Sequence, residues 1–192
     1  MKEDHASLPA LMLRLAVGPT MFAHGYNKVF GGGGLEGTER WFHGIGFRPA
    51  AVHARMAAVT EMSSGVAITL GAFNPLPNAA VIGVMVVAAR SDHREKGFFV
   101  FKGGWEYVVV LSAVTAALAG LGNGRWSVDH LIGNRRRGWK AAFGAAALGV
   151  ANGAVLLAAT FKHDREPEEV PAPPAPATNG SAAQEEATKT AP

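Results

Sequence analysis

Long runs without charged residues constrain the fold of this chain more than any other feature. At about 1.5 Å per residue, roughly 20 helical residues cross a bilayer core of about 30 Å. Five apolar segments approach or reach that length, at residues 8–30, 50–73, 76–91, 105–121 and 139–161. The first, second and fifth are long enough to span a membrane, the fourth is slightly short, and the third is the shortest. The pattern predicts membrane-spanning helices rather than a soluble domain.

The composition agrees with a membrane protein. Hydrophobic residues make up 48% of the chain and charged residues only 17%, below the usual quarter. The charges gather between the apolar segments and near the C-terminus, as in multi-pass membrane proteins. The pI is near 9.4, but aromatic residues do not alternate with basic ones, so we expect a lipid membrane and no nucleic acid as the partner. The absence of cysteine excludes disulfides, thiol redox chemistry and cysteine-ligated iron–sulfur clusters.

The expected organisation is a helical membrane bundle with a polar tail. The break NPLP at 74–77 predicts an antiparallel hairpin between the second and third segments. The C-terminal tail is rich in Pro, Ala, Glu and Thr and is predicted to be disordered. The boundaries are a short N-terminal tail at 1–7, a four-helix membrane domain at 8–131, an additional membrane helix at 139–161 and the disordered tail at 164–192. We interpret the first apolar segment as a retained helix, because acidic residues precede it and no clear cleavage site follows.

The first apolar segment carries polar residues inside it and at its end. A charged side chain near the centre of a membrane helix costs about 2.5–3.5 kcal/mol on insertion scales, so it should face the bundle interior and have a partner. At about 100° per residue, Arg14 and Lys28 share one helix face with the small residues Gly18 and Gly25. His24 lies one turn before Lys28. This face is predicted to pack against neighbouring helices.

Carboxylates lie in two other segments. Glu61 is near the middle of the second segment, on a face that it shares with Gly65, and Glu106 stands at the start of the fourth. We expect both carboxylates to converge with Arg14 and Lys28 in one polar core. That core would be either a set of ion pairs that keep the helices in register or a site for a ligand or a proton. The sequence leaves both alternatives open.

The histidines give weaker signals for cofactors. His24 and His93 have the residue type for axial ligation of a b-type haem, but histidines at the ends of spans are more often polar interface residues. We therefore do not expect haem. His24, His43 and His53 fit no known metal-ligand spacing, and no metal site is predicted.

Two glycine motifs are interpreted as structural. The run Gly31–Gly34 lacks the GxxxxGK[ST] spacing of a phosphate-binding loop, and no strand precedes it. We expect it to be a flexible exit from the first helix into a loop. Gly149 and Gly153 form a small-xxx-small pair, which favours close packing of the fifth segment against another helix.

The order and spacing of several short motifs are similar to those of the DoxX family of small bacterial four-helix membrane proteins. The motifs are HGYNK at 24–28, a membrane glutamate and small-residue helix at 61–71, His93, GGWEY at 103–107 and GNGRWSVD at 122–129. The resemblance covers much of residues 11–131 and implies a four-helix bundle in the bacterial plasma membrane. Carried over by position, it implies functional roles for His24, Lys28, Glu61, His93, Glu106 and Asp129. Asn123 stands where the family usually has a proline, and the fifth segment and the tail lie outside the family pattern.

The resemblance leaves three functions open. Some relatives are small subunits of a thiosulfate:quinone oxidoreductase, so the first is a membrane subunit or anchor of a redox complex, linked to quinone, sulfur or oxidative stress. It would bind a quinone or relay protons in its polar core, and a soluble redox partner would supply electrons; any enzymatic role would be that of an oxidoreductase subunit. The second is a small proton-coupled transporter, in which formation of a homo-oligomer would supply further helices. The third is a non-catalytic scaffold that docks soluble enzymes on the membrane.

Overall fold

A computed structural model of the chain describes residues 4–161, with side chains from residue 6 onward. Within that range every named element is helical, so the predicted all-α bundle is confirmed. The first helix begins at Asp4, inside the segment expected to be an N-terminal tail. The tail predicted to be disordered, at 164–192, lies outside the described residues.

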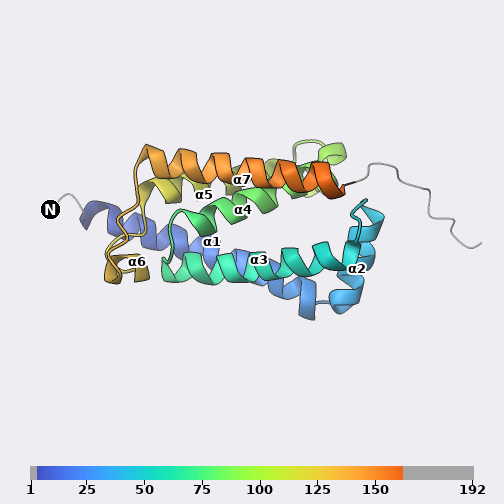
Figure 1. Cartoon of the computed structure of the whole chain (residues 1–192), viewed down its shortest axis with the longest axis horizontal. Helices are drawn as coiled ribbons and strands as arrows, with labels where there is room; N and C mark the ends of the chain where they lie inside the picture. Colours follow the sequence, from blue (N-terminus) through green and yellow to red (C-terminus); the bar gives the residue numbers. More distant parts are fainter. Residues whose placement is uncertain (1–3, 162–192) are drawn as a thin grey trace, which may run out of the picture.

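Five long helices form the bundle (Figure 1). They are α1 (Asp4–Phe30), α3 (Ala50–Leu70), α4 (Leu76–Ala88), α5 (Glu106–Leu121) and α7 (Trp139–Thr160). Each coincides with one apolar segment. An apolar run away from water must pair its backbone N–H and C=O groups within itself, and a helix does this. α1 packs along α3, α4 packs along α7, and α5 lies against α4 and α7. The chain reverses between α3 and α4, as the NPLP break predicts.

A short helix, α2 (Gly34–Gly44), follows α1 at the glycine run, so the expected flexible exit is wrong. Gly33 turns the chain with φ at 92°, a conformation that suits glycine, and α2 begins at the next residue. Phe42 of α2 is buried in a cluster that includes the start of α3. Thr38 Oγ1 donates to the backbone carbonyl of Lys28 at 2.7 Å. These tertiary contacts stabilise a helix that local glycine content does not favour.

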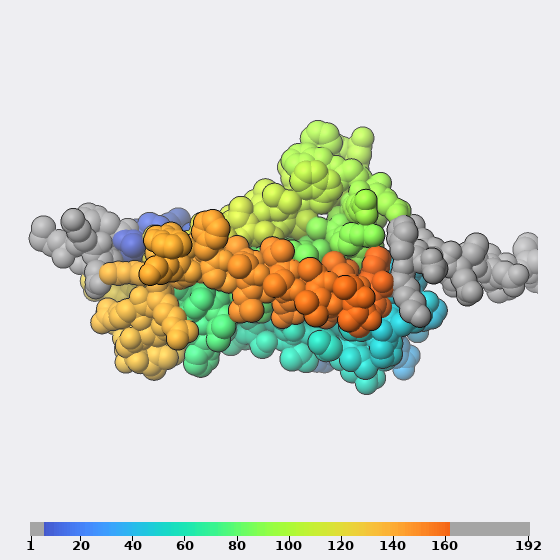
Figure 2. Space-filling view, turned by 45° about the horizontal axis from the view of Figure 1, so that its top comes forward, coloured from blue at the N-terminus to red at the C-terminus, as the bar shows by residue number. Residues whose placement is uncertain are grey.

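Shorter helical turns connect the long helices at the two ends of the bundle. α4 continues into the π-helix η1 (Ala89–His93), the 3₁₀ turns η2 (Arg94–Lys96) and η3 (Val100–Lys102) follow it, and α6 (Val128–Leu131) follows α5. The segment between α4 and α5 protrudes from the bundle as the yellow-green lobe of Figure 2. In Figure 1, α2 lies at one end of the bundle and α6 at the other. We call these the α2 end and the α6 end.

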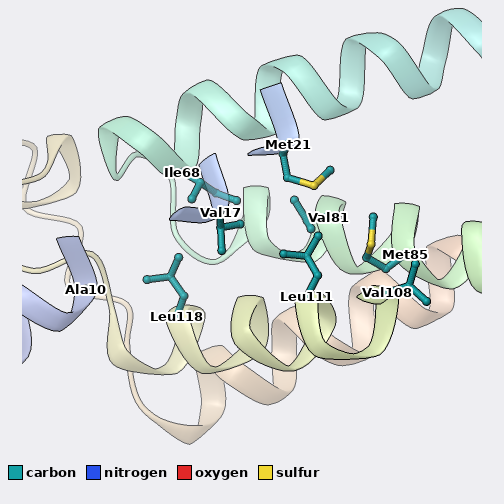
Figure 3. Packing of buried hydrophobic residues seen from close by; sticks show 9 residues of the cluster. All are labelled: Ala10, Val17, Met21, Ile68, Val81, Met85, Val108, Leu111 and Leu118. Atoms are coloured by element: carbon teal, nitrogen blue, oxygen red, sulfur yellow. The ribbon is translucent and has the colours of Figure 1, made fainter. Parts of the chain in front are cut away.

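The apolar core lies between α1, α3, α4 and α5 (Figure 3). Side chains from the four helices point toward one another, among them Met21 of α1, Ile68 of α3, Val81 of α4 and Leu111 of α5. Met21 and Val81 are fully buried. A second cluster of mostly small side chains joins α4, α5 and α7. The two clusters together hold all five long helices in one unit.

Glycines allow α1 and α3 to approach closely. A Cβ on Gly65 would lie 2.7 Å from the carbonyl oxygen of Gly18, and a Cβ on Gly25 would lie 2.7 Å from the carbonyl oxygen of Ala58. Both distances are too short for a real carbon–oxygen contact, so a side chain at either glycine would push the helices apart. Small residues enrich membrane helix interfaces for this reason.

α7 packs against α4 in the same way. A Cβ on Gly149 would lie 2.6 Å from the carbonyl oxygen of Ala79, and a Cβ on Gly153 would lie 2.9 Å from that of Gly83. α7 was predicted as an addition to a four-helix domain. In the structure it shares a close interface with α4 and is part of the bundle.

Two helices in the described range are long and apolar enough to cross a membrane, α1 over residues 6–30 and α7. Their outer faces carry large exposed apolar side chains; Phe22 of α1 is 39% exposed, and Phe143 and Val155 of α7 are 71% and 67% exposed. A continuous apolar surface of this kind suits contact with lipid rather than with water.

Candidate functional site

Arg14 is buried at the α6 end, where it binds backbone carbonyls. Its guanidinium donates to Ile68 O at 3.1 Å and Thr69 O at 2.7 Å, at the C-terminus of α3. It also donates to Asn123 O at 2.9 Å and Trp126 O at 2.7 Å, in the connection after α5. The last carbonyls of a helix lack intrahelical partners and carry partial negative charge, so one guanidinium satisfies several of them.

Asp129 of α6 is buried in the same region. Its carboxylate accepts from the backbone N–H of Phe73 at 2.7 Å, from that of Asn74 at 2.9 Å and from Asn123 Nδ2 at 2.8 Å. Phe73 has φ at 62°, which residues other than glycine rarely adopt, and the carboxylate holds that turn in place. We call these groups, with Arg14, the Arg14–Asp129 junction. It ties the α3–α4 turn to the connection between α5 and α7.

The expectation that Arg14, Lys28, Glu61 and Glu106 form one polar core is wrong. Arg14 and Lys28 share a face of α1, but 14 positions place them about 21 Å apart along its axis. Residues on one face of a helix can therefore lie at opposite ends of the bundle. Glu106 accepts the N–H of Val100 at 3.0 Å. It lies in the first turn of α5, where a carboxylate complements the positive end of the helix dipole. Of the four groups, Lys28 and Glu61 meet.

Lys28 and Glu61 form a buried ion pair at the α2 end. Lys28 Nζ lies 2.7 Å from Glu61 Oε2, and the two side chains are 15% and 5% exposed. Lys28 is in the last turn of α1, and Glu61 is in the middle of α3. Removing one member of such a pair costs about 3–5 kcal/mol, because the other charge is then buried alone.

Two histidines that were predicted to be functional also lie toward the α2 end, and each has a protein partner. The ring of His24 stacks on Tyr107 of α5, with centroids 6.1 Å apart and planes inclined by 26°. His93 Nδ1 lies 2.6 Å from the carbonyl oxygen of Gly103. The first contact joins α1 to α5, and the second closes the lobe between α4 and α5.

A cavity of about 220 Å³ opens beside the ion pair. Its walls come from α1, α2, α3, α4, η1 and α7, and the residues that concern its chemistry are Lys28, Trp41, Phe42, His53, Glu61 and His93. The remaining wall is largely apolar and includes Gly153, where α7 crosses α4. The π-helix η1 contributes Asp92 and His93, and π-helical turns occur frequently at functional sites.

His53, in the first turn of α3, is a cavity residue that was considered only as a metal ligand from the sequence. It is 7% exposed, and neither ring nitrogen has a hydrogen-bond partner in the described part of the chain. A buried polar group left without a partner costs about 1–3 kcal/mol. The available signal was spacing: Thr60 and Glu61 follow His53 by two helical turns, so polar residues recur along one side of an apolar helix.

Across residues 4–161, no group of three or more His, Asp or Glu side chains is arranged to hold a metal ion. In the cavity an apolar space meets one ion pair and one imidazole that has no hydrogen-bond partner among the described residues. Pockets for small organic ligands have this character, a mainly apolar lining with a few placed polar groups.

Comparison with known proteins places the site within a family. Residues 10–102 match the family model named DoxX. The match runs from α1 to η3 and includes His24, Lys28, Glu61 and His93, whereas Asp129 lies outside it. No curated protein and no solved structure matches the chain. Residues 10–102 therefore form a DoxX domain, the domain of a family of membrane proteins.

Proposed function

We propose that this chain is a multi-pass protein of the bacterial plasma membrane that serves as the membrane subunit or anchor of a redox complex, with a quinone as the substrate in its cavity. The observation that carries the proposal is the cavity at the α2 end, where apolar walls meet the buried Lys28–Glu61 pair. The multi-pass assignment is supported by five long helices that lie side by side and by their exposed apolar faces.

The size of the cavity fits one substituted ring. An apolar cavity of about 150 Å³ admits benzene, and this cavity measures about 220 Å³. Its polar groups are few and are fixed on packed helices, which favours one orientation of the bound ring. His53, buried without a hydrogen-bond partner among the described residues, is the second sign that the lining suits a ligand with hydrogen-bonding atoms.

The ion pair has the chemistry that a quinone site needs. An ammonium group has three N–H donors, so Lys28 Nζ can donate to a ring oxygen while it keeps its contact with Glu61. Reduction of the ring takes up two electrons and two protons, one proton at each carbonyl oxygen, and oxidation releases them. Glu61 Oε2 is the group placed to accept or give the proton at the oxygen nearest the ion pair, and the second proton is exchanged at the opposite oxygen. The chain has no cysteine, and we assign electron supply to a redox partner protein.

The test is quinone-linked activity of membranes that contain the chain and its co-purified partners. Loss of a proton-transfer group lowers rates by about 10²–10⁴, so Glu61→Gln should reduce activity by at least 100-fold. Glu39→Gln is the matched control, because Glu39 pairs with Arg55 on the surface and does not line the cavity. Equal activity in the parent and Glu61→Gln membranes would remove the proton role.

A proton-coupled transporter is the second candidate, favoured by the same buried pair. Ionisable residues within membrane helices mark ion and proton pathways, and Lys28 and Glu61 lie between α1 and α3 beside a cavity. This function requires solute uptake into sealed vesicles that stops when the proton gradient is dissipated. Quinone-linked activity without such uptake separates the two candidates.

A further inference from the structure

His53 is a buried side chain whose protein surroundings do not complete its hydrogen bonds. It is more than nine-tenths buried, and both ring nitrogens are without a partner among the described residues. Buried polar groups in folded proteins are nearly always hydrogen-bonded, so each exception calls for an explanation such as a functional role or a bound water. His53 also lines the cavity that holds the ion pair. Its position therefore points to a ligand contact.

The surroundings of His53 are aromatic. Its ring centroid lies 5.4 Å from that of Phe47, which is 5.3 Å from Phe42, and the Phe42 ring is 5.1 Å from Trp41. Both Trp41 and Phe42 line the cavity. Aromatic walls favour a flat ring in offset or edge contact. This part of the cavity thus suits a ring better than an aliphatic chain.

Glu61 of the ion pair lies farther along α3, the helix that carries His53. Glu61 follows His53 by eight positions, about 12 Å along the axis of α3, and both side chains line one cavity. A ring with oxygens at opposite positions, with a hydrogen bond of about 2.9 Å at each oxygen, spans a distance of this order. The axial spacing of the two residues on α3 is thus of the order that one para-substituted ring bridges.

We propose that His53 is a specificity-determining residue that binds one oxygen of the ring while the Lys28–Glu61 pair binds the opposite oxygen. The inference rests on the proposed function and deepens it, because it selects para-quinones and gives the ring an orientation. A neutral imidazole has one donor and one acceptor nitrogen. It can donate a hydrogen bond to the carbonyl oxygen of the quinone and accept one from the hydroxyl group of the reduced ring, so it can bind both forms.

The experiment measures binding rather than activity, on the purified full chain in lipid nanodiscs. The probe is a short-chain para-benzoquinone, and its binding is followed by quenching of Trp41 fluorescence, since Trp41 lines the cavity. A Trp41→Phe variant identifies the signal from this tryptophan. The competitor is the matching alkylbenzene, which has the same ring without oxygens. The parent should bind the quinone at least tenfold more tightly than the alkylbenzene.

The decisive variant is His53→Leu, which keeps an apolar side chain but removes the ring nitrogens. It should bind the quinone about tenfold more weakly and the alkylbenzene as the parent does. His53→Gln, which retains a donor and an acceptor, should keep most of the preference and guards against a folding defect in the leucine variant. His43→Leu is the matched control, because His43 is exposed on α2 and does not line the cavity.

The outcomes separate the inference from the proposed function. If the parent binds no quinone, both are overturned. If the parent binds quinone and His53→Leu binds it equally well, the role of His53 is overturned while the quinone site stands. If His53→Leu loses the alkylbenzene as well, His53 only shapes the cavity and the hydrogen-bonding role is overturned. Loss of the quinone preference alone supports the inference.

Discussion

The two ends of the bundle both bury charged side chains, but at the α6 end their partners are mainly backbone groups, and Asn78 Oδ1 is the buried side-chain oxygen there without a hydrogen-bond partner among the described residues. In the Arg14–Asp129 junction, one guanidinium and one carboxylate are surrounded by backbone carbonyls and N–H groups. At the α2 end, an ion pair and an imidazole that has no hydrogen-bond partner in the described part of the chain line a cavity. A completed network rigidifies a fold, whereas an incomplete one is available to a ligand. The first end is therefore interpreted as structural and the second as functional.

The largest effect is expected from Arg14→Leu at the junction. Hydrogen bonds to charged groups contribute about 1.5–3 kcal/mol each, and Arg14 makes bonds to carbonyls of both α3 and the connection after α5. We expect a loss of at least about 3 kcal/mol in the free energy of unfolding, measured by denaturant titration in detergent. Arg55→Leu, at an exposed pair with Glu39, should change it by less than about 1 kcal/mol. Similar losses in both variants would contradict a structural junction.

The next largest effect is the loss of stability when one charge of a pair is removed, and it should differ between the ion pair and the Arg14–Asp129 junction. Lys28→Met leaves Glu61 buried without its partner and should cost about 3 kcal/mol, whereas the double variant Lys28→Met with Glu61→Leu should recover much of that loss. The double variant Arg14→Leu with Asp129→Leu should not recover, because the partners of these groups are mainly backbone atoms that stay in place. Thermal unfolding of the four variants measures this. Recovery of stability in both double variants would contradict this difference between the two ends.

A smaller effect is expected where α7 forms the wall of the cavity. Gly153→Val would bring a side chain against the carbonyl of Gly83 on α4, and overpacking of this kind costs about 1–3 kcal/mol. It should also weaken binding of the quinone probe, because Gly153 lines the cavity. Gly144→Val is the control, since a Cβ on Gly144 meets nothing within 4 Å. Unfolding and fluorescence quenching measured together would show whether α7 belongs to the site.

The smallest effects should have opposite signs at the two ends. His53→Leu removes an unsatisfied polar group and should raise the stability of the ligand-free protein by about 1 kcal/mol. Ser127→Ala removes the N-cap of α6, where Ser127 Oγ accepts from the N–H of His130 at 3.2 Å, and should lower stability by about 1 kcal/mol. The midpoints of thermal unfolding compare the two variants. Destabilisation by His53→Leu would mean that His53 belongs with the structural groups.

Several features were predictable from residue spacing. The five apolar segments became α1, α3, α4, α5 and α7, and the NPLP break became the α3–α4 reversal. The small residues on α1 and α7 lie at helix contacts, because the period of the helix places them on one side. In contrast, α2 was missed, since its stability comes from Phe42 and from Thr38 rather than from local propensity.

The candidate site was only partly predictable. Lys28 and Glu61 were identified as polar residues that need partners, and they do meet. Arg14 was identified for the same reason, but its predicted partners, the membrane carboxylates, were wrong. Its actual partners are backbone carbonyls, which a sequence pattern does not reveal. His53 was undervalued for the reverse reason, since its lack of a hydrogen-bond partner among the described residues is visible only in three dimensions.

The positions and lengths of the helices follow from the order of residues, because an apolar run must satisfy its backbone hydrogen bonds locally. The same reasoning places charges inside those helices and requires that they face inward. Which charges meet was decided by the packing of helices that are distant along the chain; the bond from Arg14 to Trp126 joins residues 112 positions apart. The cavity, too, exists only where α1, α2, α3, α4 and α7 come together. Its place at one end, opposite the Arg14–Asp129 junction at the other, is a property of the tertiary structure.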